Sequence, residues 1–317
     1  MAVATDVRTV APPATRRKGG WQRKFRRSSW KSLIYALLIG GTVISIFPFA
    51  WMVSASFQPL SEMFSYPPHW IPQHATIQNY VNFFHGTRYQ SVQDIGRWIL
   101  NSAYVAIAVT LLQMFFNSLM AYQFAKRKFP GRDLIFFLFI ATMMIPGQVT
   151  LIPTYLVLKH VPLFGGNNIA GFGGHGWLDS YWGLIVPVAV SPFGIFLMRQ
   201  YFKTIPDELL DAARIDGASE FRIFWRIAMP LARPALAAMA IFTFTYFWDD
   251  FFWPLIIISS PSLYTLPLGL ASFASANKTI WTLIMAGSVI ATVPVIIVFI
   301  IFQKNFVRGI ALTGLKG

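Results

Sequence analysis

Cysteine is absent from this chain of 317 residues, and charged residues make up only 12% of it. Without cysteine there is no disulfide, no thiol chemistry and no cysteine-based metal site. The tripeptide Gly-Lys-Ser/Thr, which a phosphate-binding P-loop requires, does not occur either. The sequence therefore carries no recognisable nucleotide-hydrolysing site of its own.

Hydrophobic residues, in contrast, make up 55% of the chain, and its mean hydropathy is +0.54. This composition is typical of a membrane protein rather than a soluble domain. Crossing about 30 Å of hydrocarbon takes roughly 20 apolar residues. Six runs meet that length and predict an all-α integral membrane protein with six transmembrane helices: Leu33–Phe57, Trp98–Ala125, Leu134–Leu158, Trp182–Phe202, Pro234–Ser259 and Trp281–Phe302.

The distribution of basic residues predicts the orientation of these spans. With the N-terminus in the cytoplasm, the cytoplasmic segments hold 22 of the 26 lysines and arginines. The other four are in outer segments: Arg88, Arg97, Lys159 and Lys278. Because cytoplasmic loops are enriched in Lys and Arg, both termini are expected in the cytoplasm. The net charge of +14 is then explained without nucleic acid as a partner.

The first thirty residues are expected to form a basic, disordered cytoplasmic tail, followed by a six-helix transmembrane domain over residues 31–317. One interpretation of the tail is attraction to anionic lipid, at about 1 kcal/mol per basic residue near the surface. The other is that its charge only sets topology. The first span is too long for the core of a signal peptide, so no cleavage is expected.

The cytoplasmic loop 203–233 is polar and has the features of a broken helix. Pro206 suits the first turn of a helix, and Asp207 lies where the helix dipole favours negative charge. Gly217 weakens the helix, and Ser219 or Asp216 is suited to cap a second one. Apolar residues recur at helical spacing: Leu210, Ala213, Gly217, Phe221 and Phe224. Two interpretations remain open, a docking element for a partner and an amphipathic helix on the membrane.

Asp249 and Asp250 are the most unusual residues within a predicted span. A carboxylate at mid-bilayer costs about 2.5–3.5 kcal/mol, so ionisable groups at depth usually face a cavity or a partner. One interpretation is that at least one of them lines a polar pathway, and the other is a packing or interface role. The five histidines lie in outer loops without a helical i, i+4 pair, and no metal site is expected.

The spacing in the cytoplasmic loop resembles the EAA signature of ABC-importer permease subunits, EAA-x3-G-x9-I-x-L-P. Here it reads Asp211-Ala-Ala213, three residues, Gly217, nine residues, Ile227-Ala-Met-Pro230. Asp replaces Glu and Met replaces Leu, while every interval is kept. The chain is similar in particular to the carbohydrate-uptake branch, and to the second permease subunit of the maltose transporter. Supporting stretches include Trp70-Ile-Pro72, Ile205-Pro206-Asp-Glu-Leu209, Trp248-Asp-Asp250 and Phe306-Val-Arg-Gly309.

This resemblance implies a type I ABC importer permease fold with a cytoplasmic coupling helix, in the prokaryotic cytoplasmic (inner) membrane. The implied partners are a second permease subunit, two ATPase subunits that bind ATP and Mg, an extracytoplasmic solute-binding protein and a sugar substrate. This chain is then not an enzyme, and it moves a sugar or oligosaccharide by alternating access.

The resemblance also implies roles for particular residues. Asp211 would be the acidic contact to the ATPase, and Gly217 would permit the bend. The expected coupling residues are Leu210, Asp211, Ala212, Ala213, Asp216, Gly217, Ala218, Phe221 and Pro230. The candidates for the substrate pathway are Trp248, Asp249, Asp250 and Phe252.

Other functions remain open at this point. Within the ABC class, a polyol or a glycerol-phosphate-type solute is an alternative substrate. An ion-coupled secondary transporter is the chief rival class, and it would show inverted repeats and midplane charges. No such repeat is evident in the sequence. A membrane structural or signalling subunit that moves nothing is a second rival.

Overall fold

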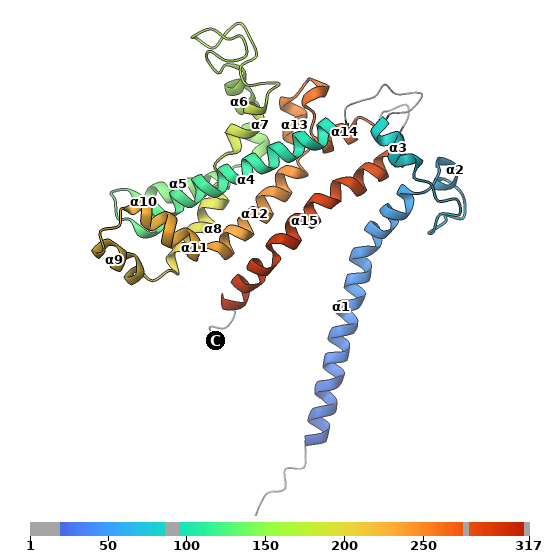
Figure 1. The fold of residues 1–317 in the computed structure, drawn as a ribbon, viewed down its shortest axis with the longest axis horizontal. Coiled ribbons are helices and arrows are strands. Elements are labelled where there is room, and N and C mark those ends of the chain that lie inside the picture. The colour runs from blue at the N-terminus through green and yellow to red at the C-terminus, as the bar shows by residue number, and fades with distance from the viewer. Residues whose placement is uncertain (1–19, 86–94, 275–278, 314–317) are drawn as a thin grey trace, which may run out of the picture. The chain divides into compact units, whose positions relative to one another are not determined.

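The computed structural model describes residues 20–85, 95–274 and 279–313, and these are predominantly helical (Figure 1). The chain divides into two units, Met1–Trp51 and Met52–Gly317. Helix α1 (Gly20–Ser56) contains the described part of the first unit. Residues 1–19 of the predicted basic tail lie outside the described residues, and the helix begins at Gly20. The predicted all-α class is confirmed.

The second unit contains the remaining helices. Two short helices, α2 and α3, precede the long helix α4, and the last helix, α15, is also long. The helices before the loop 203–233 are α2 (Leu60–Met63), α3 (Gln78–His85), α4 (Ile95–Lys126), α5 (Arg132–Thr142), α6 (Gly147–Lys159), α7 (Tyr181–Ile185), η1 (Val186–Val188) and α8 (Pro192–Lys203). Those that follow are α9 (Asp207–Ile215), α10 (Glu220–Ile223), η2 (Phe224–Ala228), α11 (Met229–Leu231), α12 (Arg233–Trp248), α13 (Phe252–Ile257), η3 (Pro261–Leu263), α14 (Leu266–Ala271) and α15 (Trp281–Thr313).

Three of the described helices are long and apolar enough to cross a membrane unbroken: Trp30–Ser56, Ile95–Lys126 and Trp281–Lys304. They coincide with the first, second and sixth predicted spans. The third predicted span is not one straight helix, because α5 and α6 meet at 100°. Pro146 precedes α6 in an extended conformation, and a proline disfavours helical geometry in the residue before it. The fold therefore reaches six spans only if each bent pair counts as one.

The fourth span is bent by 40° between η1 and α8, where Ser191-Pro192 begins the second helix. Pro192 has no N–H, so the carbonyl of Val188 loses its helical donor. Gln113 of α4 replaces that donor, with its Nε2 atom 2.7 Å from the Val188 oxygen. Asn117, one turn further along α4, accepts the backbone N–H of Ser191 at 3.0 Å. Polar side chains of α4 thus satisfy the backbone at the break, as apolar surroundings require.

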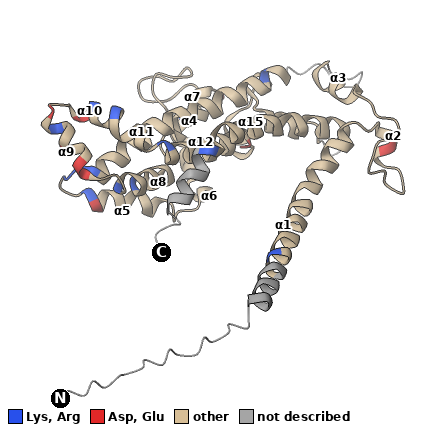
Figure 2. Cartoon of the chain, turned by 60° about the horizontal axis from the view of Figure 1, so that its bottom comes forward, with Lys and Arg blue, Asp and Glu red and all other residues tan. Residues whose placement is uncertain are grey.

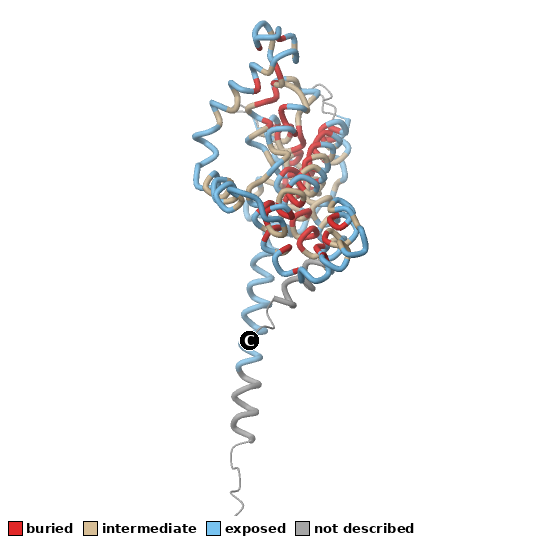
Figure 3. Tube along the Cα trace, turned by 90° about the vertical axis from the view of Figure 1, so that its left-hand side faces the viewer, coloured by how far each residue is buried: buried red, intermediate tan, exposed pale blue. Residues whose placement is uncertain are grey.

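Buried residues of the second unit form two hydrophobic clusters, and α4 contributes to both. Figure 3 shows buried positions gathered among the helices of this unit. The first cluster contains Trp98 and Val105 of α4 together with residues of α7, α12, α14 and α15. Trp98 fixes one end of α4 there, since its indole donates to the Pro261 carbonyl at 3.0 Å. The second cluster contains Tyr122 and Phe124 at the other end of α4, packed on α8–α12. The helix α4 therefore runs from one core into the other.

The glycine-rich loop between α6 and α7 is anchored by Asp179. Its carboxylate accepts the backbone N–H groups of Ser259 and Ser260, each at 2.9 Å, and the Ser260 hydroxyl at 2.5 Å. Partial burial raises the pKa of Asp179, but these hydrogen bonds outweigh burial and leave the pKa below its ordinary value. The loop is therefore joined to the segment that follows α13.

Candidate functional site

The loop 203–233 folds into α9, α10, η2 and α11, and charged residues of the second unit gather around α9 and α10 (Figure 2). Helix α9 begins after Pro206 and carries Asp207 and Glu208 in its first turn, where negative charge is favourable. Leu210 on its inner side is buried in the second core cluster. The expected helical loop is present, and it is packed onto the ends of α4 and α8 rather than standing alone.

Gly217 ends α9 in a left-handed conformation, with φ of +80°. The N–H of Gly217 bonds to the Arg214 carbonyl at 3.0 Å, and the N–H of Ala218 bonds to the Ala213 carbonyl at 2.9 Å. This pair of bonds is the Schellman arrangement, which favours glycine at the left-handed position. Ser219 then caps α10 by accepting the N–H of Arg222. A Cβ atom at Gly217 would meet no neighbour within 4 Å, so lack of space is not the reason for glycine here. The reason is the left-handed backbone conformation, which glycine adopts without strain.

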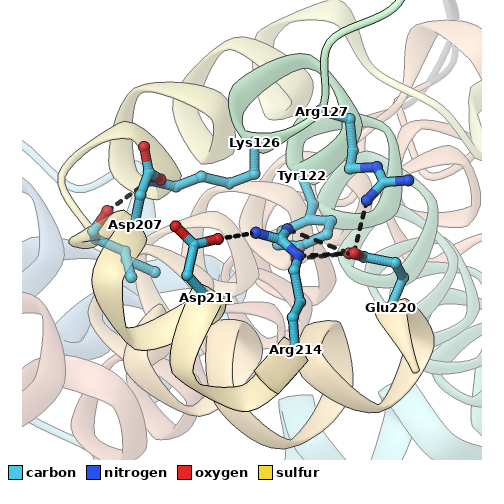
Figure 4. Close-up of polar contacts among 8 residues, drawn as sticks. Tyr122, Lys126, Arg127, Asp207, Asp211, Arg214 and Glu220 are labelled. Atoms are coloured by element: carbon cyan, nitrogen blue, oxygen red, sulfur yellow. Dashed lines mark hydrogen bonds and ion pairs between the residues drawn. The ribbon is translucent and has the colours of Figure 1, made fainter. Parts of the chain in front are cut away.

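An ion-pair network connects the two arms of this turn to α4 (Figure 4). Arg214 of α9 donates to Asp211 at 2.5 Å and to Glu220 of α10 at 2.8 Å. Glu220 also pairs with Arg127 at 2.6 Å, just after the end of α4. These contacts raise the pKa of Arg214 above its ordinary value, with the Glu220 hydrogen bond as the main cause. Glu220 thus holds α9, α10 and the end of α4 together, which fixes the shape of the turn.

Lys126 makes a second link between α4 and this loop. Its ammonium group donates to the Ile205 carbonyl at 2.5 Å and to the Asp207 carboxylate at 2.6 Å. Only 5% of the Lys126 side chain is exposed. The hydrogen bond from Lys126 lowers the pKa of Asp207 below its ordinary value. A displacement of α9 would therefore act directly on the end of α4.

Most of the predicted coupling residues lie on the outer surface of this loop. Asp211 is exposed and pairs with Arg214, and Phe221 is 62% exposed. Leu210 differs, since it is 1% exposed and packs inside the chain. The others are exposed or half-buried: Ala212, Ala213, Asp216, Gly217, Ala218 and Pro230. The outer face therefore combines small residues, two acids and an aromatic ring.

Several residues of this surface were not singled out by the sequence. Ile215 is 87% exposed and Leu209 is 48% exposed, so the apolar outer face is larger than the predicted one. Leu209 and Leu210 are adjacent in α9 and therefore point about 100° apart. The helical periodicity of the sequence could have placed Leu209 on the exposed face. The pairing of Arg214 with Glu220 depends on the turn at Gly217, which brings α10 back beside α9.

The four candidates for a substrate pathway lie at the end of α12 and the start of α13. Trp248 is buried, and its indole donates to the Ala291 carbonyl of α15 at 2.8 Å. Asp249 is exposed and lines neither of the two cavities of this region. Asp250 and Phe252 both line a cavity of about 470 Å³ that also contacts α6. The structure thus brings two of the four to one cavity.

The cavity beside Asp250 adjoins a second one of about 640 Å³, because both are lined by Pro187, Val188, Tyr246 and Phe247. The break in the fourth span therefore forms part of both walls. Among the described residues, no three His, Asp or Glu side chains are grouped closely enough to hold a metal ion.

Comparison with known proteins gives consistent matches. Residues 113–312 match the family model described as "Binding-protein-dependent transport system inner membrane component". The arabinooligosaccharides transport system permease protein AraQ of Bacillus subtilis (strain 168) is 35% identical, over 87% of this chain and 92% of that protein. The sn-glycerol-3-phosphate transport system permease protein UgpE of Yersinia pestis bv. Antiqua (strain Antiqua) is 36% identical, over 87% of this chain and 94% of that protein.

A solved structure shares the fold. It is a bacterial ABC transporter involved in the import of the acidic polysaccharide alginate, and the matched chain has a TM-score of 0.72 at 22% identity. The match covers 93% of this chain and all of that one. The two chains therefore share the same helical fold.

Proposed function

Since this chain belongs to the family of binding-protein-dependent transport system inner membrane components, we propose that it forms one half of the membrane pathway of an ATP-driven saccharide importer. In this proposal the second half is a different permease subunit. Two ATPase subunits bind ATP and Mg on the cytoplasmic side, and an extracytoplasmic protein delivers the solute. This chain itself performs no chemical step.

The observation that carries the proposal is the turn at Gly217. It presents exposed apolar groups, Ile215 and Phe221 among them, around the exposed carboxylate of Asp211. The same turn is fixed to α4 through Glu220 and Lys126. The outer surface of this turn can bind a partner, and its inner side is fixed to α4 by ion pairs. Such an element is suited to transmit motion from a partner to the transmembrane helices. Tight packing between two discrete arrangements allows such a short element to move whole helices.

The charge distribution supports the proposed orientation. Figure 2 shows basic residues gathered at the end of the second unit that holds α5, α9 and α10. Lys126 and Arg127 lie there at the end of α4, where they pair with Asp207 and Glu220. If both termini are cytoplasmic, this end faces the cytoplasm, in agreement with the enrichment of Lys and Arg in cytoplasmic loops. An ATPase subunit would then meet the turn directly. Both termini are proposed to lie in the cytoplasm of a prokaryote.

The proposed solute is a sugar or oligosaccharide. One relative is named for arabinooligosaccharide transport, and another solved complex of the same fold contains a periplasmic protein bound to an alginate pentasaccharide. The relative named for sn-glycerol-3-phosphate transport supports a second candidate, a polyol phosphate. The walls of the two cavities bear on this choice.

The test is purification of the complex that contains this chain from its native membrane, through a tag on the chain. We expect ATPase subunits and one other permease to co-purify. After reconstitution into vesicles, ATP hydrolysis should rise when the cognate binding protein and its solute are added, and the solute should accumulate. Recovery of the chain without an ATPase, or uptake driven by an ion gradient alone, would refute the proposal.

A further inference from the structure

The cavity between α6 and the end of α12 has walls of hydrogen-bonding groups. Gln148, Thr150 and Thr154 of α6 lie on one side, and Asp250 lies on the other. The Thr150 hydroxyl donates to the Gly147 carbonyl at 3.0 Å, and the Thr154 hydroxyl donates to the Thr150 carbonyl at 2.7 Å. With their hydrogens engaged, both hydroxyl oxygens keep lone pairs that accept hydrogen bonds from a solute.

Asp250 adds a further acceptor. Its Oδ1 atom accepts the backbone N–H groups of Phe252 at 3.1 Å and Trp253 at 3.3 Å. These two bonds hold the carboxylate at the end of α12 and leave Oδ2 to accept from a ligand. A wall rich in acceptors suits a solute with many hydroxyl donors, because each hydroxyl that leaves water needs a partner.

Aromatic rings complete the wall. Tyr246 is 67% exposed and Phe252 is 52% exposed, and both line this cavity. The indole of Trp253 also lines it and is held in place by a hydrogen bond from Nε1 to the Gly183 carbonyl at 3.2 Å. Flat apolar faces beside a few placed polar groups are typical of small-molecule sites, and the C–H faces of a sugar ring can rest on them.

The charge of the walls distinguishes among possible solutes. Asp250 is the only charged residue among the described residues that line the two adjoining cavities, and no Lys, Arg or His is present there. The start of α6 contributes about half a positive charge, while the carboxylate brings a full negative one. A phosphate or uronate group would meet a like charge without a cation to balance it, and such an arrangement disfavours binding.

We propose that this cavity accepts an uncharged saccharide and disfavours solutes that carry phosphate or carboxylate, with Asp250, Thr150 and Thr154 accepting hydrogen bonds from sugar hydroxyls. The proposal rests on the importer function argued above and narrows its solute class. It assigns solute contact to this permease, in addition to any contact made by the partner permease. It also separates Asp250 from its neighbour Asp249, which lines neither cavity.

The test uses the reconstituted complete importer with its binding protein. Uptake is measured for an uncharged trisaccharide, a uronate trisaccharide and sn-glycerol-3-phosphate. The variants are Asp250→Asn, which keeps the Oδ1 acceptor, Asp249→Asn at the neighbouring carboxylate outside the cavity, and Thr150→Val on the exposed face of α6. Thr142→Val is the matched control, because its hydroxyl makes the same kind of intrahelical bond, to Phe139, and it lines neither cavity.

We expect the parent complex to take up the uncharged saccharide. Asp250→Asn should reduce this uptake about tenfold or more, because a hydrogen bond to a charged acceptor is lost. Thr150→Val should reduce uptake less, and Thr142→Val should match the parent. All variants should retain the ATPase subunits. ATP-driven uptake of an anionic solute instead, or parental uptake by Asp250→Asn, would overturn this inference and leave the importer function standing. Equal losses from Asp249→Asn and Asp250→Asn would also overturn it. Absence of any ATPase would refute both proposals.

Discussion

Substitution of Gly217 separates the contribution of backbone conformation from that of side-chain size. The residue has φ of +80°, and a Cβ atom there would meet no other atom within 4 Å. The cost of alanine is therefore the cost of a left-handed backbone, about 1–2 kcal/mol. That cost lowers the population of the native turn by a factor of about 5–30 relative to its alternatives. Asparagine is larger than alanine but tolerates this conformation better, while valine tolerates it worst.

The expected order of transport per ATP hydrolysed is therefore glycine, asparagine, alanine, valine. The assay is solute uptake and phosphate release measured on the same reconstituted vesicles, with the ATPase content of each preparation as the control for assembly. The variants should insert into the membrane normally, because Gly217 lies in an exposed turn. An order that follows size, with asparagine below alanine, would refute the backbone argument. Parental coupling in all three variants would refute the role of the turn.

Two further predictions concern ionised groups. Glu220→Gln leaves Arg214 and Arg127 without their shared carboxylate. Because Glu220 is about one-third exposed, we expect the native turn to be destabilised by only about 1 kcal/mol. The measured result should be lower uptake per ATP, with the ATPase subunits retained. A double-mutant cycle with Arg127→Ala should show coupling between the two residues, and strict additivity would contradict the network. Asp179 has a pKa below its ordinary value of 3.8 in the folded protein. Its contribution to folding stability is therefore present above that pH and is lost as the pH falls through the lowered pKa. The difference in thermal stability between parent and Asp179→Asn should therefore shrink below that pH, and a constant difference would refute the assignment.

The loop 203–233 was the part of the fold best predicted from sequence. The intervals from Asp211 to Pro230 pointed to an importer permease, and the family match over residues 113–312 confirms that resemblance. Proline and serine at helix starts and glycine at a helix end follow local backbone rules, so the break at Gly217 and the cap at Ser219 were accessible. These features depend on residues within one turn of each other.

The bends and the cavity walls were less accessible. Apolar runs predicted where spans lie, but a proline within such a run is compatible with a continuous helix or with a break. Pro153 lies inside α6, whereas Pro146 marks a bend of 100°. A single sequence does not distinguish these two outcomes, because a proline fits the start of a helix and is also tolerated inside a transmembrane one. Thr150 and Asp250 lie a hundred residues apart, and nothing in a single sequence indicates that they line the same cavity.

The span of α4 has a mechanical consequence. Its 32 residues extend for about 48 Å at the usual rise of 1.5 Å per residue. One end is held by Lys126 at the helix that leads into the Gly217 turn, and the other is held by the hydrogen bond from Trp98 to Pro261. A rotation of about 5° about one end of a rod of this length displaces the other end by about 4 Å. A displacement of about 4 Å is longer than a hydrogen bond of about 3 Å. A small rotation of α4 at the turn would therefore break or form hydrogen bonds at the far end of the helix.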